Sequence, residues 1–354
     1  MLVCRNRRDA GLRSADRGAR AAPEVTFPAG RRPRVKILKI TALLLALLAA
    51  VLGGVAAYVR LALPNVGPPP DLHVGSDPEL VVRGEYLARH VTVCVDCHSE
   101  RDWTMFAGPI VPGTEGKGGE LFGQDAGLPG EFYASNITPA ALRSWTDGEL
   151  ARAITAGVTR TGEALFPIMP YPAYAHLTPR DLEAIIAYVR TLAPIENAVA
   201  DRQLAFPMNL IVRTIPQAAP PARTVDPNDP VAYGKYLVQI AACAECHTPA
   251  KDGAKVVGME LAGGFEFRTP AGAVRSRNIT PDVETGIGSW DRQRFVATFK
   301  AFAPEHGRMR LAAEAGYNTP MPWAMYGGMT EEDLAAIYDY LRTVPPIRNA
   351  VPTP

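Results

Sequence analysis

Residues that can bind a metal are scarce in this sequence, which holds five cysteines and six histidines among 354 residues. Four of the cysteines lie in two short motifs, which leaves only Cys4, a free thiol without a predicted role. A structural zinc site takes four cysteine or histidine ligands, and residues 99–242 contain no second C-x-x-C to complete one. Disulfides within each cysteine pair are the other simple interpretation. They leave the histidine that follows each pair unexplained.

Catalytic groups of the common enzyme classes are also missing. No paired catalytic carboxylates, nucleophile and base, or phosphate-binding loop accompanies the two cysteine motifs. No nucleic-acid partner is expected. The function must therefore come from what the two motifs bind.

The two motifs are C-V-D-C-H at 94–98 and C-A-E-C-H at 243–247. C-x-x-C-H is the attachment site of a c-type haem. Two thiols one helical turn apart form thioethers with the vinyl groups of one porphyrin, and the imidazole directly behind them binds the iron. We therefore predict two covalently attached haem c groups, held through Cys94, Cys97 and His98 and through Cys243, Cys246 and His247.

A membrane segment precedes both motifs. Ile40 to Val59 is free of charged residues and as a helix would be about 30 Å long, which matches the hydrocarbon core of a bilayer. Basic residues crowd its N-terminal side, so the positive-inside rule places everything after residue 60 outside the cytoplasm. We predict a single-pass anchor at 36–60 in the bacterial inner membrane, with both haem motifs in the periplasm. A cleaved signal peptide is the alternative, because Gly53 and Gly54 lie among small residues suited to cleavage.

Charge is distributed unevenly along the chain. Residues 1–60 carry 12 Lys/Arg and 3 Asp/Glu, whereas the remainder has an acidic excess. Residues 1–35 are Arg-rich and lack apolar periodicity, so we predict a disordered N-terminus. A further hypothesis is that translation begins near Val35.

The region after the anchor contains an internal repeat. A proline-rich spacer, 61–76, leads to a first domain at 77–199; a linker, 200–228, leads to a second at 229–351. Shared segments in the two domains argue for duplication of one haem-binding unit: they are Gly84-Glu85-Tyr86-Leu87 and Gly234-Lys235-Tyr236-Leu237, Asn136-Ile137-Thr138-Pro139 and Asn278-Ile279-Thr280-Pro281, and Ser144-Trp145 and Ser289-Trp290. Apolar residues between Leu204 and Val212 are expected to cover part of the seam between the domains.

Each predicted domain begins and ends with a helix. Pro78 to His98 is expected to be one helix that delivers the first C-x-x-C-H. Thr178-Pro179-Arg180-Asp181 predicts the start of the last helix of domain 1, with a Thr N-cap, Pro at N1 and an acid at N3 as in a capping box. Thr330-Glu331-Glu332-Asp333 predicts the same start in domain 2.

The second axial ligand of each iron should occupy equivalent positions in the two repeats. Met169 and Met321 do so: each lies between prolines or next to one, just before the last helix, with a Tyr five residues further on. A thioether raises the reduction potential relative to a second imidazole. We predict iron ligation by His98 and Met169 and by His247 and Met321.

Other histidines and tryptophans fit this role less well. His176 is the chief rival in domain 1, but domain 2 has Gly328 at that place. His90 is too close to the motif to reach the distal side, and His73 and His306 have no repeat counterpart, which favours solvated surface. Trp145 and Trp290 either pack against haem or fill the core. Asn136 and Asn278 are expected to hydrogen-bond their own loop or a haem propionate.

These motifs resemble a known family. G-E-Y-L-A-R before C-x-x-C-H, N-I-T-P, a distal M-P-[YW] and a final D-L-x-A-I-x-x-Y-[VL]-R helix are similar to the membrane-bound cytochrome c subunits of bacterial alcohol, aldehyde and gluconate dehydrogenases, over residues 78–351. Several of those subunits carry three C-x-x-C-H motifs, whereas this chain has two. The resemblance implies an all-α architecture of two tandem class I cytochrome c domains behind one N-terminal transmembrane helix. It also implies electron transfer from a periplasmic dehydrogenase toward quinone or a terminal oxidase.

Two functions follow from these expectations. Two irons closed by methionine suit a membrane-anchored dihaem electron carrier that is not itself an enzyme, because a saturated iron passes electrons but binds no substrate. The alternative is a dihaem peroxidase-type enzyme with one open haem. It predicts different distal residues in the two halves, and the matched M-P motifs disagree with that.

Overall fold

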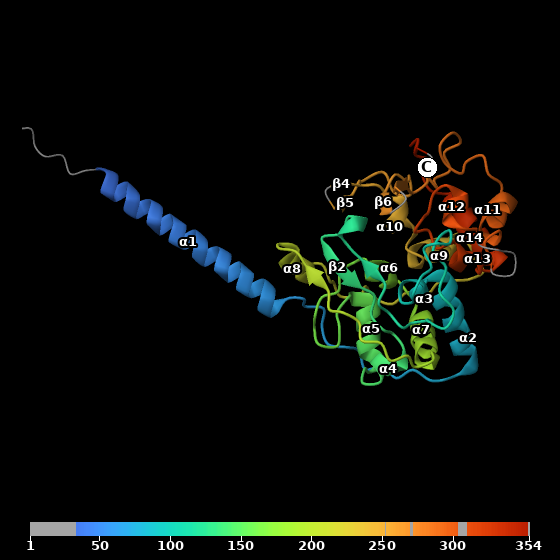
Figure 1. The fold of residues 1–354 in the computed structure, drawn as a ribbon, viewed down its shortest axis with the longest axis horizontal. Helices are drawn as coiled ribbons and strands as arrows, with labels where there is room; N and C mark the ends of the chain where they lie inside the picture. The colour runs from blue at the N-terminus through green and yellow to red at the C-terminus, as the bar shows by residue number, and fades with distance from the viewer. Residues whose placement is uncertain (1–32, 252, 270–271, 304–309, 353–354) are drawn as a thin grey trace, which may run out of the picture. The chain divides into compact units, whose positions relative to one another are not determined.

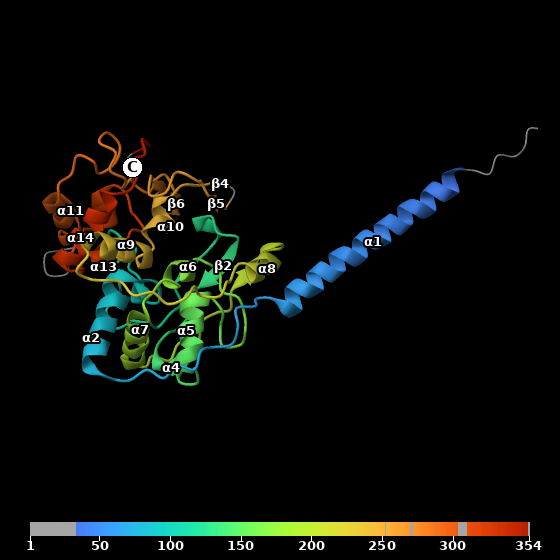
Figure 2. The same ribbon diagram turned by 180° about the vertical axis from the view of Figure 1, so that it is seen from behind.

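The computed structural model describes residues 33–251, 253–269, 272–303 and 310–352. Most of the predicted disordered N-terminus, together with Cys4 and His306, lies outside these ranges. Residues Met1–Gly54 and Val55–Pro354 separate into two compact units, and the second contains both repeats (Figures 1 and 2).

The chain is mostly helical, as predicted. The α-helices are α1 (Pro33–Ala62), α2 (Pro78–Tyr86), α3 (Cys94–Cys97), α4 (Pro139–Leu142), α5 (Asp147–Ala156), α6 (Tyr171–Tyr174), α7 (Pro179–Thr191), α8 (Met208–Ile211), α9 (Pro230–Ile240), α10 (Cys243–His247), α11 (Arg292–Lys300), α12 (Ala312–Ala315), α13 (Trp323–Gly327) and α14 (Glu331–Leu341). A π-helix, η1 (Leu87–Val91), and two 3₁₀ turns, η2 (Gln124–Ala126) and η3 (Val212–Thr214), complete the helical elements of the described residues.

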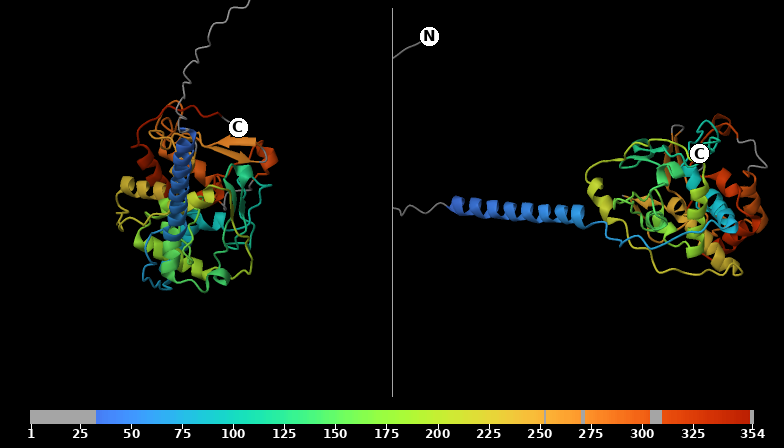
Figure 3. Two further views of the ribbon diagram at one scale, coloured as in Figure 1. Left: turned by 90° about the vertical axis from the view of Figure 1, so that its left-hand side faces the viewer. Right: turned by 90° about the horizontal axis from the view of Figure 1, so that it is seen from below.

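Short strands are a feature that an all-α prediction omits. They are β1 (Leu121–Phe122), β2 (Gly130–Tyr133), β3 (Gln203–Leu204), β4 (Ala250–Lys251), β5 (Ala254–Lys255), β6 (Glu266–Thr269) and β7 (Gly272–Arg275). All pairings are antiparallel, in the order β1-β2-β3, β4-β5 and β6-β7. Figure 3 draws β6 and β7 as a pair of orange arrows. Strands this short hold neighbouring loop segments together and do not form a core.

Helix α1 is the one described helix that is long and apolar enough to cross a membrane, over Val35–Ala62. It starts before the predicted anchor at 36–60, and none of its residues from 35 to 62 is buried. Its length, composition and place near the N-terminus fit either a membrane anchor or a signal sequence.

Each repeat is closed by a pair of helices that cross at a glycine. α2 packs against α7 in the first repeat, and α9 against α14 in the second (Figure 1). A Cβ at Gly84 would lie 1.8 Å from the carbonyl oxygen of Ala184, and one at Gly234 would lie 1.8 Å from that of Ala336. Only glycine permits backbones to approach this closely. The repeated G-x-Y-L segment therefore marks a helix crossing.

The predicted single helix over Pro78–His98 is wrong, because it is interrupted before the cysteines. The π-helix η1 follows α2, and Val93 then adopts a left-handed conformation with φ 49° and ψ 34° before α3 begins. The second repeat has one residue fewer between its glycine and its first cysteine. A π turn accommodates one extra residue in a helix, so the single-residue difference accounts for η1. Ala242 breaks the second helix in the same way, with φ 54°.

The N-caps of the terminal helices are confirmed. The Thr178 hydroxyl accepts the N–H of Asp181 at 3.2 Å, and Thr330 accepts that of Asp333 at 3.1 Å. The acids at N3 do not complete capping boxes, however. Their carboxylates bond to tyrosines of the opposite repeat.

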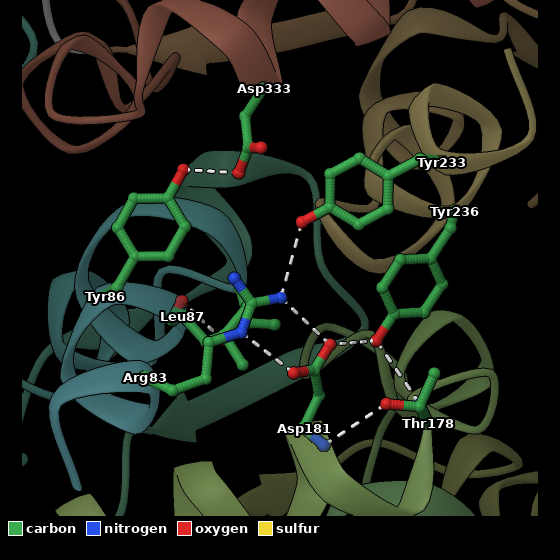
Figure 4. A network of polar contacts seen from close by, with 9 residues as sticks. Arg83, Tyr86, Leu87, Thr178, Asp181, Tyr233, Tyr236 and Asp333 are labelled. Carbon is green, nitrogen blue, oxygen red and sulfur yellow. Dashed lines mark hydrogen bonds and ion pairs between the residues drawn. The ribbon is translucent and has the colours of Figure 1, made fainter. Parts of the chain in front are cut away.

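Tyr86 of the first repeat reaches the N-terminus of α14 in the second. Its hydroxyl donates to the Asp333 carboxylate at 2.6 Å and accepts the N–H of Thr330 at 3.2 Å (Figure 4). Burial raises the pKa of both groups, with the Asp333 charge adding to the shift at Tyr86. The tyrosine thus takes the place that a capping-box carboxylate would have occupied.

Tyr236 makes the reciprocal contact from the second repeat to the first. Its hydroxyl donates to Asp181 at 2.6 Å and accepts the N–H of Thr178 at 3.2 Å. Asp181 is also paired with Arg83, whose guanidinium reaches Tyr233 at 3.4 Å (Figure 4). Tyr86 and Tyr236 therefore make matching hydrogen bonds to an aspartate of the opposite repeat, whereas, among the described residues, the ion pair with Arg83 occurs only at Asp181.

One apolar cluster extends through both repeats. Leu87, Ile185 and Ile186 from the first repeat and Leu237 and Leu334 from the second belong to it, each 0–1% exposed. Residues of the two repeats therefore share a continuous core.

The linker contacts the first repeat more than the predicted seam. Leu204 in β3 pairs with Gly130 in β2, and Phe206 is 78% exposed. Arg213 donates to the carbonyls of Val59 and Leu63. Val212 alone among the apolar residues expected there is fully buried, at 1%.

Candidate functional site

Both C-x-x-C-H motifs form a short helix that starts immediately after the left-handed residue, α3 in the first repeat and α10 in the second. This places the two thiols of each pair one turn apart. The four cysteines are free thiols. Burial raises the pKa of Cys94, and it raises the pKa of Cys97 and Cys243 to about 12 and that of Cys246 to about 11. At neutral pH each motif therefore presents neutral thiols rather than thiolates.

The two motif histidines are held by matching backbone contacts. Nδ1–H of His98 donates to the carbonyl of Ser135, and Nδ1–H of His247 donates to that of Arg277, each at 2.7 Å. This bond fixes the tautomer in which Nε2 carries the lone pair. Burial lowers the pKa of both imidazoles. Each imidazole is therefore neutral, and its Nε2 carries the lone pair that a metal would need.

The carbonyls of Ser135 and Arg277 come from the repeated N-I-T-P loops. The side-chain oxygen of Asn136 accepts the N–H and the hydroxyl of Thr138, and its amide donates to the carbonyl of Ile195. Asn278 makes the same set of bonds with Thr280 and Ile347. These motifs thus fix the loop that orients each histidine. The expectation that Asn136 and Asn278 hydrogen-bond their own loop is confirmed. Ser135 and Arg277 themselves were not predicted, because any residue offers a carbonyl.

The predicted distal methionines lie in equivalent, half-buried positions. Met169 and Met321 both pack against the apolar cluster that also contacts Cys94 and Cys243. Two hydrogen bonds tie the segments after these methionines to the backbone just before each motif: Tyr174 donates to the carbonyl of Thr92 at 2.6 Å, and Tyr326 to that of Ala241 at 2.9 Å. The tyrosine that follows each methionine by five residues therefore connects the two sides of each site.

The remaining histidines have different surroundings. His90 bonds to the carbonyl of Met325 in the second repeat at 2.9 Å. His176 keeps a buried Nδ1 without a hydrogen-bond partner, and burial, with help from Arg223, lowers its pKa. His73 is exposed, 3.6 Å from Asp71, as predicted.

The residues present fit a covalently bound haem better than a metal ion alone. No cluster of three or more His, Cys, Asp or Glu side chains suited to a metal occurs among the described residues, so the zinc alternative lacks a ligand set there. Tyr171, directly after the Met169-Pro170 pair, has a buried hydroxyl without a hydrogen-bond partner. Paired thiols, an oriented imidazole and a half-buried thioether in each repeat are the donors that haem c takes.

Comparison with known proteins also indicates a protein that binds haem c. The cytochrome c family model matches residues 231–345. A diheme cytochrome c-type protein of Cereibacter sphaeroides is 30% identical over 297 residues, which cover 77% of this chain and 91% of that protein.

The other similar proteins are subunits of dehydrogenases. The gluconate 2-dehydrogenase cytochrome c subunit of Pantoea cypripedii is 29% identical, covering 75% of this chain and 59% of its own. The fructose dehydrogenase cytochrome subunit of Gluconobacter japonicus is 30% identical, covering 75% and 52%. This chain thus spans only about three fifths or less of the length of these two relatives.

The fold and the two motifs define a c-type cytochrome, a protein that binds haem covalently. The chain belongs to the cytochrome c family.

Proposed function

We propose that the chain is a membrane-anchored periplasmic dihaem electron carrier, organised as a domain at 77–199 and a domain at 229–351. One haem c would be attached to Cys94 and Cys97, with His98 and Met169 as axial ligands. The other would be attached to Cys243 and Cys246, with His247 and Met321. The observation that carries the proposal is the duplicated bond from a motif histidine to a loop carbonyl, because it prepares the same iron ligand twice.

The ligands and the surrounding core suit electron transfer rather than substrate chemistry. Haem iron, when bound, supplies a one-electron redox couple. The neutral imidazole and the thioether are soft or borderline ligands that favour the ferrous state. An apolar surrounding acts in the same direction, because it disfavours the extra positive charge of the ferric state. A methionine on the distal side leaves no position for a substrate.

The two motifs share one core. Cys94 of the first motif and Cys243 of the second pack against the same apolar cluster. This supports transfer of an electron from one haem site to the other within the chain.

The partners are proposed from the relatives. The similar subunits are those of gluconate 2-dehydrogenase and fructose dehydrogenase, which supports a periplasmic dehydrogenase as electron donor. Quinone or a terminal oxidase is the proposed acceptor. Helix α1 would hold the chain in the bacterial inner membrane.

Carbon monoxide binding tests the proposal. We expect the purified, dithionite-reduced holoprotein to contain two haems per chain by the pyridine haemochrome assay and to show no spectral change with carbon monoxide. Binding at one haem would instead favour the peroxidase-type alternative, and fewer than two haems would contradict the dihaem assignment.

A further inference from the structure

The loop that follows the first haem motif is longer than its equivalent after the second, although the same backbone bond closes both, Val111 N–H to Glu100 and Val256 N–H to Pro249. Residues 101–110, defined here as the bracing loop, form a closed turn in which Arg101 and Ile110 pair as an isolated antiparallel bridge. After the second motif the chain forms the exposed β4–β5 hairpin. The two repeats therefore differ in the length of this loop.

Arg101 fixes the shape of the bracing loop from inside. Its guanidinium donates to the carbonyls of Ala107 and Gly108, each at 2.7 Å, and pairs with Asp96 at 3.2 Å. Asp96 lies between the two cysteines of the first motif, and both side chains are 5% exposed or less. In the second motif the corresponding Glu245 is exposed. The first haem motif thus determines the position of this loop.

The tip of the bracing loop is bound by Asn318 of the other repeat, which lies in the segment that leads to Met321. The Asn318 amide donates to the carbonyls of Trp103 and Met105 at 3.0 and 3.3 Å, and its oxygen accepts the N–H of Ala107 at 2.8 Å. Asn318 is only 6% exposed. A buried amide satisfied in this way has one preferred orientation, and leaving it unpaired is costly.

Further contacts extend the same attachment. Phe106, 4% exposed, donates its N–H to the carbonyl of Arg310 at 2.8 Å, and its ring stacks on Phe302 and meets Tyr317 edge-on. Thr104 accepts the N–H of Ala312 at 2.9 Å. The loop is therefore docked through both backbone and rings.

Asn318 is three residues before Met321, and a short chain of bonds joins them. The Asn318 oxygen also accepts the N–H of Thr319 at 2.8 Å, and the Thr319 hydroxyl accepts the N–H of Met321 at 3.2 Å. Pro320 and Pro322 restrict the backbone on both sides of the methionine. A displacement at Asn318 would consequently move Met321.

His90 holds the other end of the segment. Its Nδ1–H donates to the carbonyl of Met325, and its ring fills the space in which a Cβ at Gly328 would lie, 2.2 Å away.

We propose that the bracing loop and Asn318 position Met321, so that the distal side of the second haem site is built in part by the first repeat. Asn318 is a positioning residue in this proposal, and it acts through Thr319. The inference rests on the proposed function, since it takes Met321 as the distal ligand.

The test compares Asn318→Ala with Met321→Ala and the wild type, all as full-length holoproteins. Ferric haem with His/Met ligation shows a weak long-wavelength sulfur-to-iron charge-transfer band. We expect Met321→Ala and Asn318→Ala each to lower this band to about half, since one of two sites is affected. One of the two reduction potentials should fall in each variant and the other should stay constant. Asn228→Ala, an exposed linker asparagine, is the matched control and should match the wild type.

The outcomes separate the two proposals. If Met321→Ala leaves the band intact, the ligand assignment is wrong; if Met321→Ala halves it and Asn318→Ala changes neither the band nor the potentials, the positioning role is wrong. Should Asn318→Ala fail to assemble with two haems, Asn318→Asp is measured in its place. It keeps the acceptor oxygen and loses both donors, so a partial loss of the band supports the proposal and an unchanged band overturns it.

Discussion

At the residue scale, the interface tyrosines show how identical side chains can have unequal importance. Tyr86 and Tyr236 make matching bonds, but Asp181 also has Arg83 as a partner. No ion pair to Asp333 occurs among the described residues. The Asp333 carboxylate thus depends more strongly on its tyrosine.

Replacing each tyrosine by phenylalanine tests this difference. We expect Tyr86→Phe to lower the free energy of unfolding by about 1–3 kcal/mol, because it leaves a buried carboxylate without its donor. Tyr236→Phe should have the smaller effect, since Arg83 still pairs with Asp181. Chemical denaturation of the holoproteins measures both, and Tyr133→Phe, whose hydroxyl meets only Glu131 at the surface, is the control. Equal losses in the two interface variants would contradict the asymmetry.

Part of the candidate site is predictable at this scale. The two C-x-x-C-H motifs identify the cysteines and histidines, and the repeat points to Met169 and Met321 because their positions match. Their role as iron ligands stays a prediction. Ser135 and Arg277 are not predictable from side-chain chemistry, since they act through carbonyls. Asn318 is hidden for a related reason: its partners lie some 210 residues earlier in the chain, and the first repeat offers no counterpart to compare.

At the element scale, the crossing of helices at Gly84 and Gly234 is the feature most sensitive to change. A methyl group at either position would collide with a backbone carbonyl, which cannot rotate away as a side chain can. The pairing of α2 with α7 and of α9 with α14 would have to widen to admit it.

Alanine at either glycine should therefore be severely destabilising. We expect Gly84→Ala or Gly234→Ala to cost about 3 kcal/mol or more, the upper range for overpacking a core, and to reduce haem content per chain. Haem quantification and thermal unfolding would show this. Gly75→Ala serves as the control, because nothing lies within 4 Å of a Cβ there, and a variant at Gly84 as stable as this control would refute the argument.

Helix ends were easier to predict than helix interiors. Thr178 and Thr330 cap α7 and α14 as their sequences indicate. The sequence does not predict the interruption between α2 and α3, because a π turn and a left-handed valine carry no local propensity signal. The one-residue length difference between the repeats was the available clue.

At the scale of the whole molecule, the two repeats share one core, so His90 between them reports on the stability of both. Burial lowers its pKa below the ordinary value of 6.5. As the pH falls, His90 is therefore protonated in the unfolded chain before it is protonated in the folded protein. Its contribution to the free energy of unfolding is fully present above the unfolded pKa and is lost as the pH falls below it. His90 should make the protein less stable as the pH drops below 6.5.

Glutamine at position 90 removes the titration and keeps an amide donor for the Met325 carbonyl. We expect His90→Gln to show a smaller loss of thermal stability than the wild type between pH 7 and about 5. The difference between the two curves isolates this group, because the other titrating residues are common to both. Parallel curves would show that His90 does not titrate in this range.

The reciprocal tyrosine contacts have the form of an isologous contact, in which residue i of one half meets residue j of the other and j meets i. Two identical single-haem chains would make this contact as a symmetric pair, with every substitution appearing on both sides at once. Fusion into one polypeptide removes that constraint, and each side is then free to mutate alone. Arg83 and Tyr233, which directly precede the matching glycines of the two repeats, differ in this way: one side of the contact has a salt bridge to Asp181 and the other has an aromatic ring.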